Sequence, residues 1–164
     1  MKTADLCDRY ADELQIADPG LHAFGGRMMF SGRIVTVKVF EDNSLVREAL
    51  NQDGSGQVLV VDGGGSRRCA LLGDRLAALA VEHGWNGIVL NGCLRDAAGI
   101  AALPLGLRAL ATHPLRSIKQ GTGERQLPVR FAGIHFQPGQ FLYADHDGIV
   151  VAQRNLADQD TQGA

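Results

Sequence analysis

The sequence lacks any long hydrophobic run. None of its 164 residues lies in an apolar stretch long enough to span a membrane, and residues 1–6 lack the apolar centre of a secretory signal peptide. The three cysteines, Cys7, Cys69 and Cys93, are scattered and odd in number, so they do not form a disulfide framework. These absences predict a cytoplasmic protein with reduced thiols and no membrane partner.

The sequence also has no excess of charge of one sign. Its 16 basic and 18 acidic residues give a net charge of −2, so no overall field attracts the protein to nucleic acid or anionic lipid. No His-x-x-x-His or Cys-x-x-Cys spacing occurs. Direct nucleic-acid binding and a zinc cluster are therefore not expected.

Proline is scarce, with five residues, whereas glycine is abundant, with 21. The glycines indicate many tight turns, and they follow no period of the kind that a collagen or a solenoid shows. The length suits one domain with its own core. We expect that domain to span residues 1–153 and the polar residues 154–164 to form a frayed C-terminal tail.

The clearest local pattern is a strand, a turn, a helix and a second strand. The short apolar runs 58–61 and 87–90 are typical of buried strands. Between them, residues 74–83 repeat apolar side chains at helical spacing, and Gly84 follows as a glycine that can take a left-handed backbone. This order predicts an α/β fold, in which ligands gather at the carboxyl ends of the strands.

The remaining elements follow from weaker patterns. Near the N-terminus, Thr3 can cap a helix that carries Leu6, Tyr10 and Leu14. Later, short β-rich runs alternate with glycine turns, which predicts a C-terminal β-meander. The other predicted segments are a strand over 33–40, a helix over 43–52, an apolar run over 107–111, a polar loop over 116–125 and meander strands over 128–136, 140–144 and 148–152.

A glycine-rich segment, residues 62–66, follows the first of the buried strands. It does not fit a dinucleotide-binding fingerprint, because Arg68 stands where that motif needs glycine or alanine. No lysine follows at the place that a P-loop requires. We therefore interpret the segment as a structural turn.

Cys93 lies two residues before an arginine and could act as a nucleophile if His83, His113 or His135 activated it. No spacing in the sequence supports such a pair. Because a lone cysteine in an apolar run is more often a small core residue, we interpret Cys93 as part of the core.

The start of the predicted helix is a candidate anion site. Helix N-termini expose free backbone amides and carry a partial positive charge, both of which suit a carboxylate or phosphate. The residues concerned are Gly73, Asp74, Arg75 and Leu76.

Arg95 and Asp96 follow the strand at 87–90, so they could converge with the helix start at one edge of the sheet. From composition alone, a surface ion pair, or an aspartate that caps a helix beginning at Ala97, is the commoner arrangement. An arginine fork beside a carboxylate would also suit an oxyacid held next to a hard metal ion.

Several distinctive strings occur in order along nearly the whole chain. They are Phe24-Gly25-Gly26-Arg27, Phe40-Glu41-Asp42-Asn43, and the strings at residues 60–66, 70–74 and 143–148. Together they resemble the RraA-like family, which contains metal-dependent 4-hydroxy-4-methyl-2-oxoglutarate aldolases and the regulator of ribonuclease activity A. The resemblance implies a compact α/β domain of the swivelling β/β/α type, assembled as a homotrimer with sites near subunit boundaries.

The resemblance also implies roles for the candidate residues. The backbone of residues 73–76 would hold the carboxylate of a small keto-acid substrate, Arg95 would bind substrate and act in catalysis, and Asp96 would act in catalysis as the metal ligand. One carboxylate plus waters suits a divalent cation such as Mg²⁺ or Mn²⁺. The chain departs from the family pattern at Gly99, where many aldolases carry an acid, so weaker metal binding or water orientation is expected.

The implied activity is that of a divalent-metal-dependent lyase of the class II aldolase type. It would cleave 4-hydroxy-4-methyl-2-oxoglutarate to two pyruvates and decarboxylate oxaloacetate through the same pyruvate enolate. The acceptor of the hydroxyl proton stays open between a water on the metal and Asp145 or Asp147 of a neighbouring subunit. The alternative is a non-catalytic protein that binds and inhibits a ribonuclease, and the presence of Asp96 beside Arg95 favours the enzyme.

Overall fold

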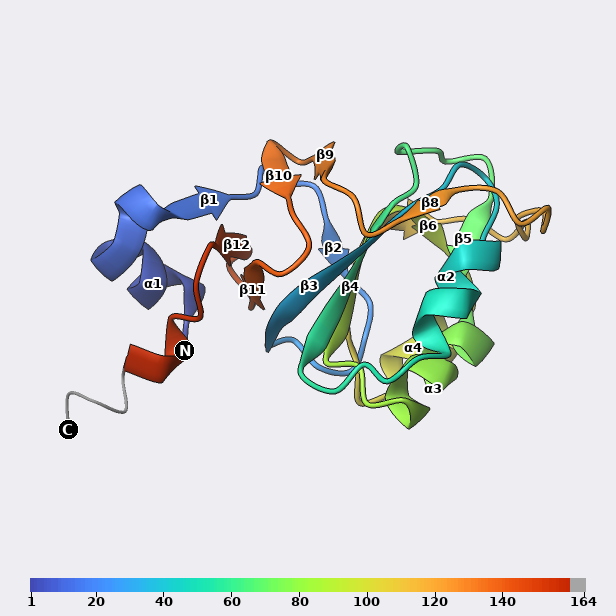
Figure 1. Cartoon of the computed structure of the whole chain (residues 1–164). Coiled ribbons are helices and arrows are strands. Elements are labelled where there is room, and N and C mark those ends of the chain that lie inside the picture. The colour runs from blue at the N-terminus through green and yellow to red at the C-terminus, as the bar shows by residue number, and fades with distance from the viewer. Residues whose placement is uncertain (160–164) are drawn as a thin grey trace.

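The protein folds around one large mixed β-sheet, which the computed structural model describes within residues 1–159 (Figure 1). The strands are β1 (Leu14–Ile16), β2 (His22–Ala23), β3 (Phe30–Lys38), β4 (Gln57–Asp62), β5 (Ala70–Leu72), β6 (Gly87–Leu94), β7 (Gly106–Thr112), β8 (Glu124–Arg125), β9 (Val129–Phe131), β10 (Ile134–Phe136), β11 (Phe141–Ala144) and β12 (Ile149–Ala152). The helices are α1 (Thr3–Tyr10), α2 (Ser44–Leu50), α3 (Asp74–Glu82) and α4 (Ala97–Ala101), with short 3₁₀ turns at Ala11–Glu13 and Ala157–Gln159. In this described part of the chain, no helix is long and apolar enough to cross a membrane.

The strand order of the sheet is β1-β12-β11-β3-β4-β6-β7-β2, with β5 added beside β6 and β8 beside β3. The central strands β3, β4, β6 and β7 run parallel to one another. The outer strands pair antiparallel, and β9 and β10 form a separate hairpin. The parallel centre therefore gathers the carboxyl ends of several strands at one edge, where α/β folds bind ligands.

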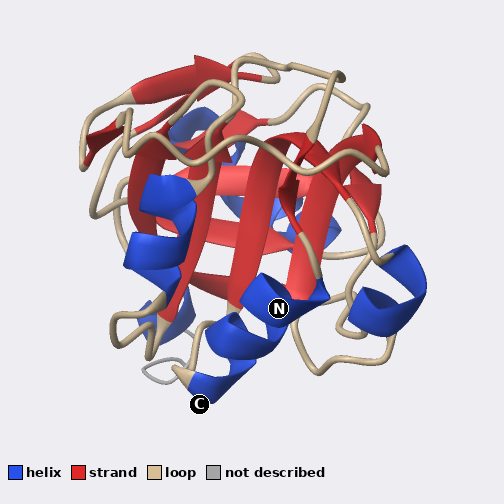
Figure 2. Cartoon of the chain, turned by 90° about the vertical axis from the view of Figure 1, so that its right-hand side faces the viewer, coloured by secondary structure: helices blue, strands red, loops and turns tan. Residues whose placement is uncertain are grey.

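Both faces of the central strand β4 are buried, as expected for a continuous apolar run. Leu59 and Val61 belong to the core cluster that includes residues of α2, α3 and α4. Val58 and Val60 point the other way and belong to the cluster that includes the β9–β10 hairpin. Figure 2 views the molecule from the side on which α2, α3 and α4 lie in Figure 1.

The predicted strand, helix and strand unit is confirmed. Residues 58–61 lie in β4, residues 87–90 lie in β6, and α3 ends at Glu82, one residue before the predicted end. Gly84 adopts a φ of +79°, the left-handed backbone expected after a helix. The α/β fold class is therefore correct.

Three predictions in the outer parts of the chain are wrong. The first helix stops at Tyr10, and Leu14 begins β1, which pairs with β12. Residues 128–136 are not one strand, because Ala132 and Gly133 take φ values of 50° and 71° and turn the chain into the β9–β10 hairpin. The predicted strands over 128–136, 140–144 and 148–152 do not form one meander either, because β9 and β10 form a sheet of their own, whereas β11 and β12 pair in the large sheet.

Part of the predicted C-terminal tail is ordered. Leu156 is fully buried, and its amide donates to the hydroxyl of Tyr143 at 2.7 Å. That hydroxyl also donates to Oδ1 of Asn155 at 2.9 Å. Asn155 and Leu156 are therefore held against β11, and residues 160–164 lie outside the described residues.

Candidate active site

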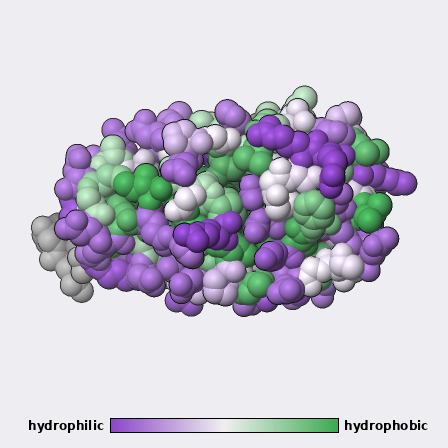
Figure 3. Space-filling view, turned by 90° about the horizontal axis from the view of Figure 1, so that it is seen from above, coloured by the Kyte–Doolittle hydropathy of each residue, from purple (hydrophilic) through white to green (hydrophobic). Residues whose placement is uncertain are grey.

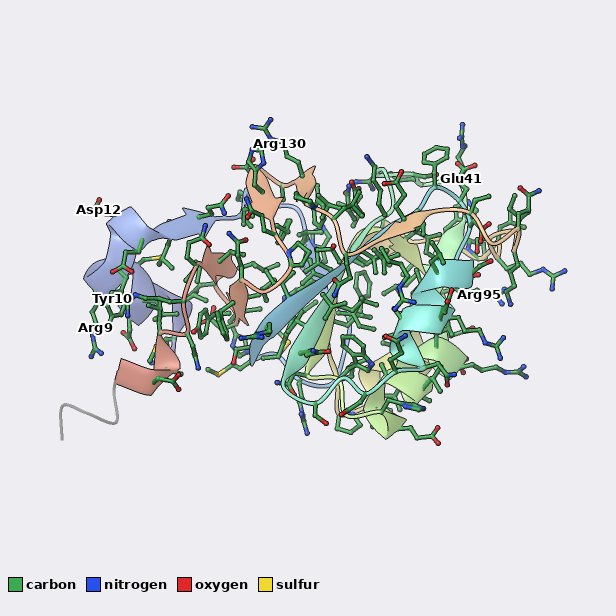
Figure 4. All side chains as sticks on the ribbon, viewed as in Figure 1. Arg9, Tyr10, Asp12, Glu41, Arg95 and Arg130 are labelled. Atoms are coloured by element: carbon green, nitrogen blue, oxygen red, sulfur yellow. The ribbon has the colours of Figure 1, made fainter. Side chains whose placement is uncertain are left out.

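A cleft of about 670 Å³ opens beside the ends of β5 and β6. Residues 73–76 follow β5, Arg95 and Asp96 follow β6, and all of them line the cleft. The structure thus brings together every residue that the sequence predicts for the site. Figure 4 shows Arg95 beside the α2–α4 side of the molecule, at the opposite end from Arg9 and Tyr10.

Asp96 has an unusual backbone conformation. Its φ of 58° and ψ of 39° are left-handed, which destabilises a non-glycine residue by about 1–2 kcal/mol. It occupies the N-cap position of α4, yet its side chain makes no capping hydrogen bond there. Its Oδ2 instead accepts a hydrogen bond of 3.3 Å from the backbone amide of Asp74. The interpretation of Asp96 as a cap for its own helix is therefore wrong, and within residues 1–159 it forms no ion pair with Arg95.

Gly73 permits the close approach of the two segments. A Cβ at this position would lie 2.7 Å from Oδ2 of Asp96 and 3.5 Å from Cγ of Arg95. The amide of Arg95 also donates to the carbonyl of Leu72 at 2.9 Å, which ties the end of β6 to the end of β5. Because no Cβ intervenes, both side chains lie against the start of α3.

The first turn of α3 offers backbone donors to a ligand. Its N-cap, Gly73, provides no side-chain cap. The amides of Arg75 and Leu76 lie in that turn, so they have no acceptor within the helix. The helix dipole adds partial positive charge at the same point. This arrangement suits a carboxylate or another small oxyanion.

The cleft has an excess of positive charge. Two carboxylates, those of Asp74 and Asp96, line it together with several cationic side chains. Within residues 1–159, none of these cations makes an ion pair or a side-chain hydrogen bond. They are Arg47, Arg75, Arg95, Arg116 and Lys119. An anionic ligand would therefore meet positive charge that the protein does not neutralise.

A buried carboxylate fixes the loop that carries two of these cations. Asp42 is 1% exposed, and it accepts hydrogen bonds from the amide and hydroxyl of Ser44, the amide of Gln120 and the amide and hydroxyl of Thr122, at 2.6–3.2 Å. Burial raises the pKa of Asp42, but these hydrogen bonds lower it well below its ordinary value. The loop over residues 116–122 is thus anchored to the start of α2.

The sequence did not indicate this second side of the cleft. It predicts residues 116–125 only as a polar loop, yet Arg116, Ser117 and Lys119 line the cleft together with Asn43 and Arg47. A usable signal was present, because the loop follows β7, a parallel neighbour of β6. Basic residues in such a loop lie near the edge of the sheet where ligands bind.

The donor set suits a cation that keeps most of its water. No group of three or more His, Cys, Asp or Glu side chains in the described residues could hold a metal ion. Asp96, by contrast, presents an exposed carboxylate with one long hydrogen bond. Mg²⁺ is commonly bound by one or two carboxylates plus waters and substrate, so the residues fit Mg²⁺ or Mn²⁺.

Gly99, the departure from the family pattern, lies beside an acid that is already present. A Cβ on Gly99 would lie 3.4 Å from Cβ and 3.5 Å from Oδ2 of Asp74. A carboxylate at position 99 would therefore approach the carboxylate of Asp74, which lines the same cleft. Asp74 therefore supplies negative charge at the place where an acid at position 99 would lie.

The glycine-rich turn has no free amides for a nucleotide. The amides of Gly63 and Gly65 donate to the carbonyl of Asn91 at 3.1 and 3.2 Å. The amide of Gly64 donates to Oδ1 of Asp62 at 2.9 Å. The interpretation of this segment as a structural turn is confirmed.

Cys93 is a core residue. Its side chain is 1% exposed, and burial raises the pKa of the thiol. Because the thiolate is the nucleophilic form, such a cysteine is poorly reactive. The interpretation of Cys93 as part of the core is confirmed.

Asp145 and Asp147 line a different cleft, of about 410 Å³. The carboxylate of Asp145 accepts hydrogen bonds from the amide and hydroxyl of Thr3, both at 2.7 Å, and from the amide of Asp147 at 2.9 Å. These bonds attach α1 to the sheet. A catalytic role for either aspartate in a neighbouring subunit stays a prediction, since neither lines the cleft beside α3 in its own chain.

Comparison with known proteins gives a consistent family. A family model described as RraA-like (Aldolase/RraA) matches residues 3–151. A relative from Laribacter hongkongensis (strain HLHK9), provisionally named 4-hydroxy-4-methyl-2-oxoglutarate aldolase, is 63% identical over 150 residues, which cover 92% of this chain and 94% of the relative. A relative from Alkalilimnicola ehrlichii with the same provisional name is 60% identical over 154 residues, covering 94% of this chain and 96% of the relative.

Two solved structures share the fold but have other names. One, from Geobacillus kaustophilus HTA426, is described as S-adenosylmethionine:2-dimethylmenaquinone methyltransferase; it has a TM-score of 0.95 and 54% identity, covering 96% of this chain and 98% of that chain. The other is the RNA-processing inhibitor RraA from Thermus thermophilis, with a TM-score of 0.91 and 47% identity, covering 94% of this chain and 93% of that chain. Since the relatives' names differ in activity, the function must be argued from the site.

Proposed function

Because this chain belongs to the RraA-like family, we propose that it is a divalent-metal-dependent lyase that cleaves 4-hydroxy-4-methyl-2-oxoglutarate into two molecules of pyruvate. The provisional names of the Laribacter and Alkalilimnicola relatives support this activity. The observation on which the proposal depends is the backbone of Asp96, which is left-handed although its side chain makes no capping bond. Backbone strain that does not serve the capping of the residue's own helix is typical of functional sites.

The residues at the start of α3 would bind the 2-oxo acid end of the substrate. The amides of Arg75 and Leu76 would donate to its carboxylate, and the guanidinium of Arg95 would donate to its keto oxygen. A divalent cation held by Asp96 would supply Lewis-acid stabilisation of negative charge at that keto oxygen. These contacts would orient the bond that breaks.

Cleavage breaks the bond between C3 and C4 of the substrate. The C4 hydroxyl loses its proton, a carbonyl forms at C4, and the electron pair of the broken bond passes to C3 as a pyruvate enolate. Arg95, which has no anionic partner within residues 1–159, would stabilise that enolate through a charge-assisted hydrogen bond. Protonation at C3 then gives the second pyruvate.

Oxaloacetate decarboxylation is the second proposed activity. Loss of carbon dioxide from oxaloacetate leaves the same enolate, so Arg95 would stabilise it in the same way. This reaction needs no base to deprotonate a hydroxyl. The ratio of the two activities would therefore report on the proton acceptor.

Pyruvate release tests the proposed activity. Purified protein would be assayed with 4-hydroxy-4-methyl-2-oxoglutarate and with oxaloacetate, in Mg²⁺ or Mn²⁺ and again with EDTA. We expect release that EDTA abolishes and that added metal restores. Absence of release from both substrates with either metal would contradict the proposal.

The methyltransferase description of the Geobacillus structure finds no support in this site. A bound S-adenosylmethionine would commonly contact a glycine-rich turn after a strand. Here the amides of Gly63, Gly64 and Gly65 are all engaged within the chain. The proposed lyase site instead uses groups that have no partner within residues 1–159: the amides of Arg75 and Leu76 and the guanidinium of Arg95.

A second candidate function is the binding and inhibition of a ribonuclease, and the 47% identity to the Thermus RraA favours it. It would be tested by assaying RNA cleavage by a purified processing endoribonuclease with increasing amounts of this protein. Inhibition that persists in an Asp96→Asn variant would identify a role separate from the lyase site. No inhibition at excess protein would contradict it.

We also propose that the chain assembles as a homotrimer. Phe40, Leu115 and Ile118 are 57%, 59% and 57% exposed, and the amide of Ile118 donates to the carbonyl of Glu41. Figure 3 shows hydrophobic groups at the right-hand end of the upper surface, among hydrophilic ones. An interface between copies would cover such side chains. The number of copies comes from the family resemblance, so light scattering should give three times the chain mass of 17.5 kDa, and a monomer would contradict the proposal.

A further inference from the structure

A second cleft, of about 410 Å³, is lined by the loop over residues 17–23 and the turn over residues 145–149, together with Met28 and Arg108. It shares no lining residue with the cleft beside α3, so the proposed lyase site does not account for it. Its volume falls in the range of about 300–1,000 Å³ that is common for small-molecule sites. The cleft is therefore large enough to bind a small metabolite.

The wall of this cleft contains a buried arginine. Arg108, on β7, is 4% exposed. Its guanidinium donates to the carbonyls of Leu107, Met28 and Asp145 at 3.3, 2.6 and 3.0 Å. A guanidinium carries five N–H groups, so these three bonds leave two donors of a buried cation without an acceptor in residues 1–159.

No carboxylate within residues 1–159 forms an ion pair with Arg108. The ring of Phe30 lies 5.3 Å from its Cζ and covers one face of the guanidinium. Burial lowers the pKa of Arg108, and the charge of Asp145 opposes this effect, but the carboxylate of Asp145 bonds to Thr3 and to the amide of Asp147 instead. A buried cation without a bonded anion favours a ligand that supplies one.

The cleft also contains negative charge. Asp147 is exposed, and its carboxylate accepts no hydrogen bond from any of residues 1–159. Asp18 is exposed too, and its Oδ2 would lie 2.7 Å from a Cβ on Gly133. Arg108 is the one arginine or lysine among the lining residues. A simple anion would therefore meet carboxylates as well as the guanidinium, whereas a ligand that carries both charges would be attracted by both.

We propose that this cleft binds a free α-amino acid with an apolar side chain. An N–H group of Arg108 that has no acceptor donates to the ligand carboxylate, and the carboxylate of Asp147 accepts from the ligand ammonium. Apolar residues of the lining contact the side chain. They are Ala17, Pro19, Leu21, Ala23, Met28 and Ile149. The inference does not depend on the proposed lyase activity.

The walls of the cleft are fixed before a ligand binds. The amide of Ala17 donates to the carbonyl of Ile149 at 2.9 Å, and the amide of Asp145 donates to the carbonyl of Gly148 at 3.1 Å. Arg108 joins the two sides through its bonds to the carbonyls of Met28 and Asp145. Binding therefore does not have to order these segments, which favours affinity.

Three ligands test whether both charges are recognised. Calorimetry on the full chain would compare L-leucine with 4-methylpentanoate, which lacks the ammonium, and with 3-methylbutylamine, which lacks the carboxylate. We expect L-leucine to bind and each analogue to bind at least about tenfold more weakly, because each loses a charge-assisted hydrogen bond. Equal affinity for L-leucine and 4-methylpentanoate would indicate a simple anion site and overturn the proposal. Absence of binding of L-alanine, L-valine and L-leucine at millimolar concentration would overturn it as well.

Asp147→Asn tests the ammonium contact without disturbing the turn. The variant keeps the main-chain amide that donates to Asp145 at 2.9 Å. The affinity for L-leucine should fall about tenfold, whereas that for 4-methylpentanoate should stay the same or rise. Asp12→Asn is the matched control, because Asp12 is exposed and lines neither cleft. Equal losses of L-leucine affinity in the two variants would show that net charge sets the effect, and would overturn the assignment.

Arg108→Lys separates a ligand role from a structural one. Lysine keeps the charge but not the planar set of donors, so the midpoint of thermal unfolding of the free protein should fall. Saturating L-leucine should raise that midpoint in the wild type, and the rise should disappear in the variant. A rise of equal size in the variant would overturn the assignment of Arg108. If the variant does not fold, the comparison of the three ligands on the wild type decides the proposal.

Discussion

Two aspartates near the same cleft, Asp42 and Asp96, differ in burial, in hydrogen bonding and in backbone conformation. Asp42 is 1% exposed and accepts five hydrogen bonds from the chain. Asp96 is exposed, has one hydrogen bond of 3.3 Å, and adopts a left-handed backbone. The first carboxylate has no capacity left for a ligand, whereas the second has nearly all of its capacity free.

This difference suits Asp42 to a role in stability and Asp96 to a role in function. Hydrogen bonds to Asp42 stabilise its ionised form and fix the loop that carries Arg116 and Lys119. Asp96 instead occupies a strained conformation that directs its carboxylate to the start of α3. Variants at the two positions should therefore affect different observables.

Replacement of Asp96 by asparagine should give the largest effect, and on activity alone. Asparagine keeps the shape and tolerates the left-handed backbone, so the free energy of unfolding should change by less than about 1 kcal/mol. Metal-dependent pyruvate release should fall by a factor of about 1,000 or more, because the proposed metal ligand is lost. Activity assays and urea denaturation would check both statements. Wild-type activity in this variant would refute the assignment of Asp96.

Replacement of Asp42 by alanine should lower stability instead. Five donors would lose their acceptor in a buried place, so we expect the free energy of unfolding to fall by about 3 kcal/mol, as measured by urea denaturation. Asp53→Ala is the control, because Asp53 bonds the amide and hydroxyl of Ser55 in the same local pattern but is exposed. Equal losses in the two variants would show that burial does not set the effect.

Low pH should weaken the stabilisation that the buried carboxylate of Asp42 provides. Burial raises the pKa values of Asp42 and Asp145, but hydrogen bonds lower both below their ordinary values. The unfolded chain therefore binds protons at a higher pH than the native protein, and the stabilisation is present above about pH 5 and lost as pH falls below about 4. As pH falls below about 4, each group should lower the free energy of unfolding by up to about 1.4 kcal/mol per pH unit. Urea midpoints between pH 3 and 6 should show a shallower slope in Asp42→Asn; an unchanged slope would contradict the assignment.

The sequence predicts the centre of this site well and its surroundings poorly. Hydrophobic periodicity is strong in residues 58–90, because β4 is buried on both faces and α3 is amphipathic. The β9–β10 hairpin was missed because only one of its two turn residues, Gly133, is a type that signals a turn, whereas Ala132 rarely takes the positive φ that it adopts here.

The second side of the cleft was missed for a different reason. Arg116, Ser117 and Lys119 lie in a loop without periodicity, and the hydrogen bonds that place it come from Asp42, more than 70 residues earlier. The left-handed backbone of Asp96 gives no periodic signal in the sequence either. Local sequence patterns therefore predict Arg95 and Asp96 at the end of β6, but not the loop over residues 116–122 that lines the other side of the cleft.

Gly73→Ala should give the smallest effect, and it tests how closely the Asp96 carboxylate is placed. The new Cβ would lie 2.7 Å from Oδ2 of Asp96, so the flexible carboxylate should move while the fold stays intact. We expect pyruvate release to fall about tenfold, because displacement of a catalytic group by even part of an ångström weakens catalysis. Gly99→Ala is the control: its Cβ would lie at an ordinary 3.4 Å from Asp74 and should add up to about 1 kcal/mol of helix stability. If both alanine variants keep full activity, the position of Asp96 against α3 does not govern the reaction, and the contrast between the two aspartates holds for stability only.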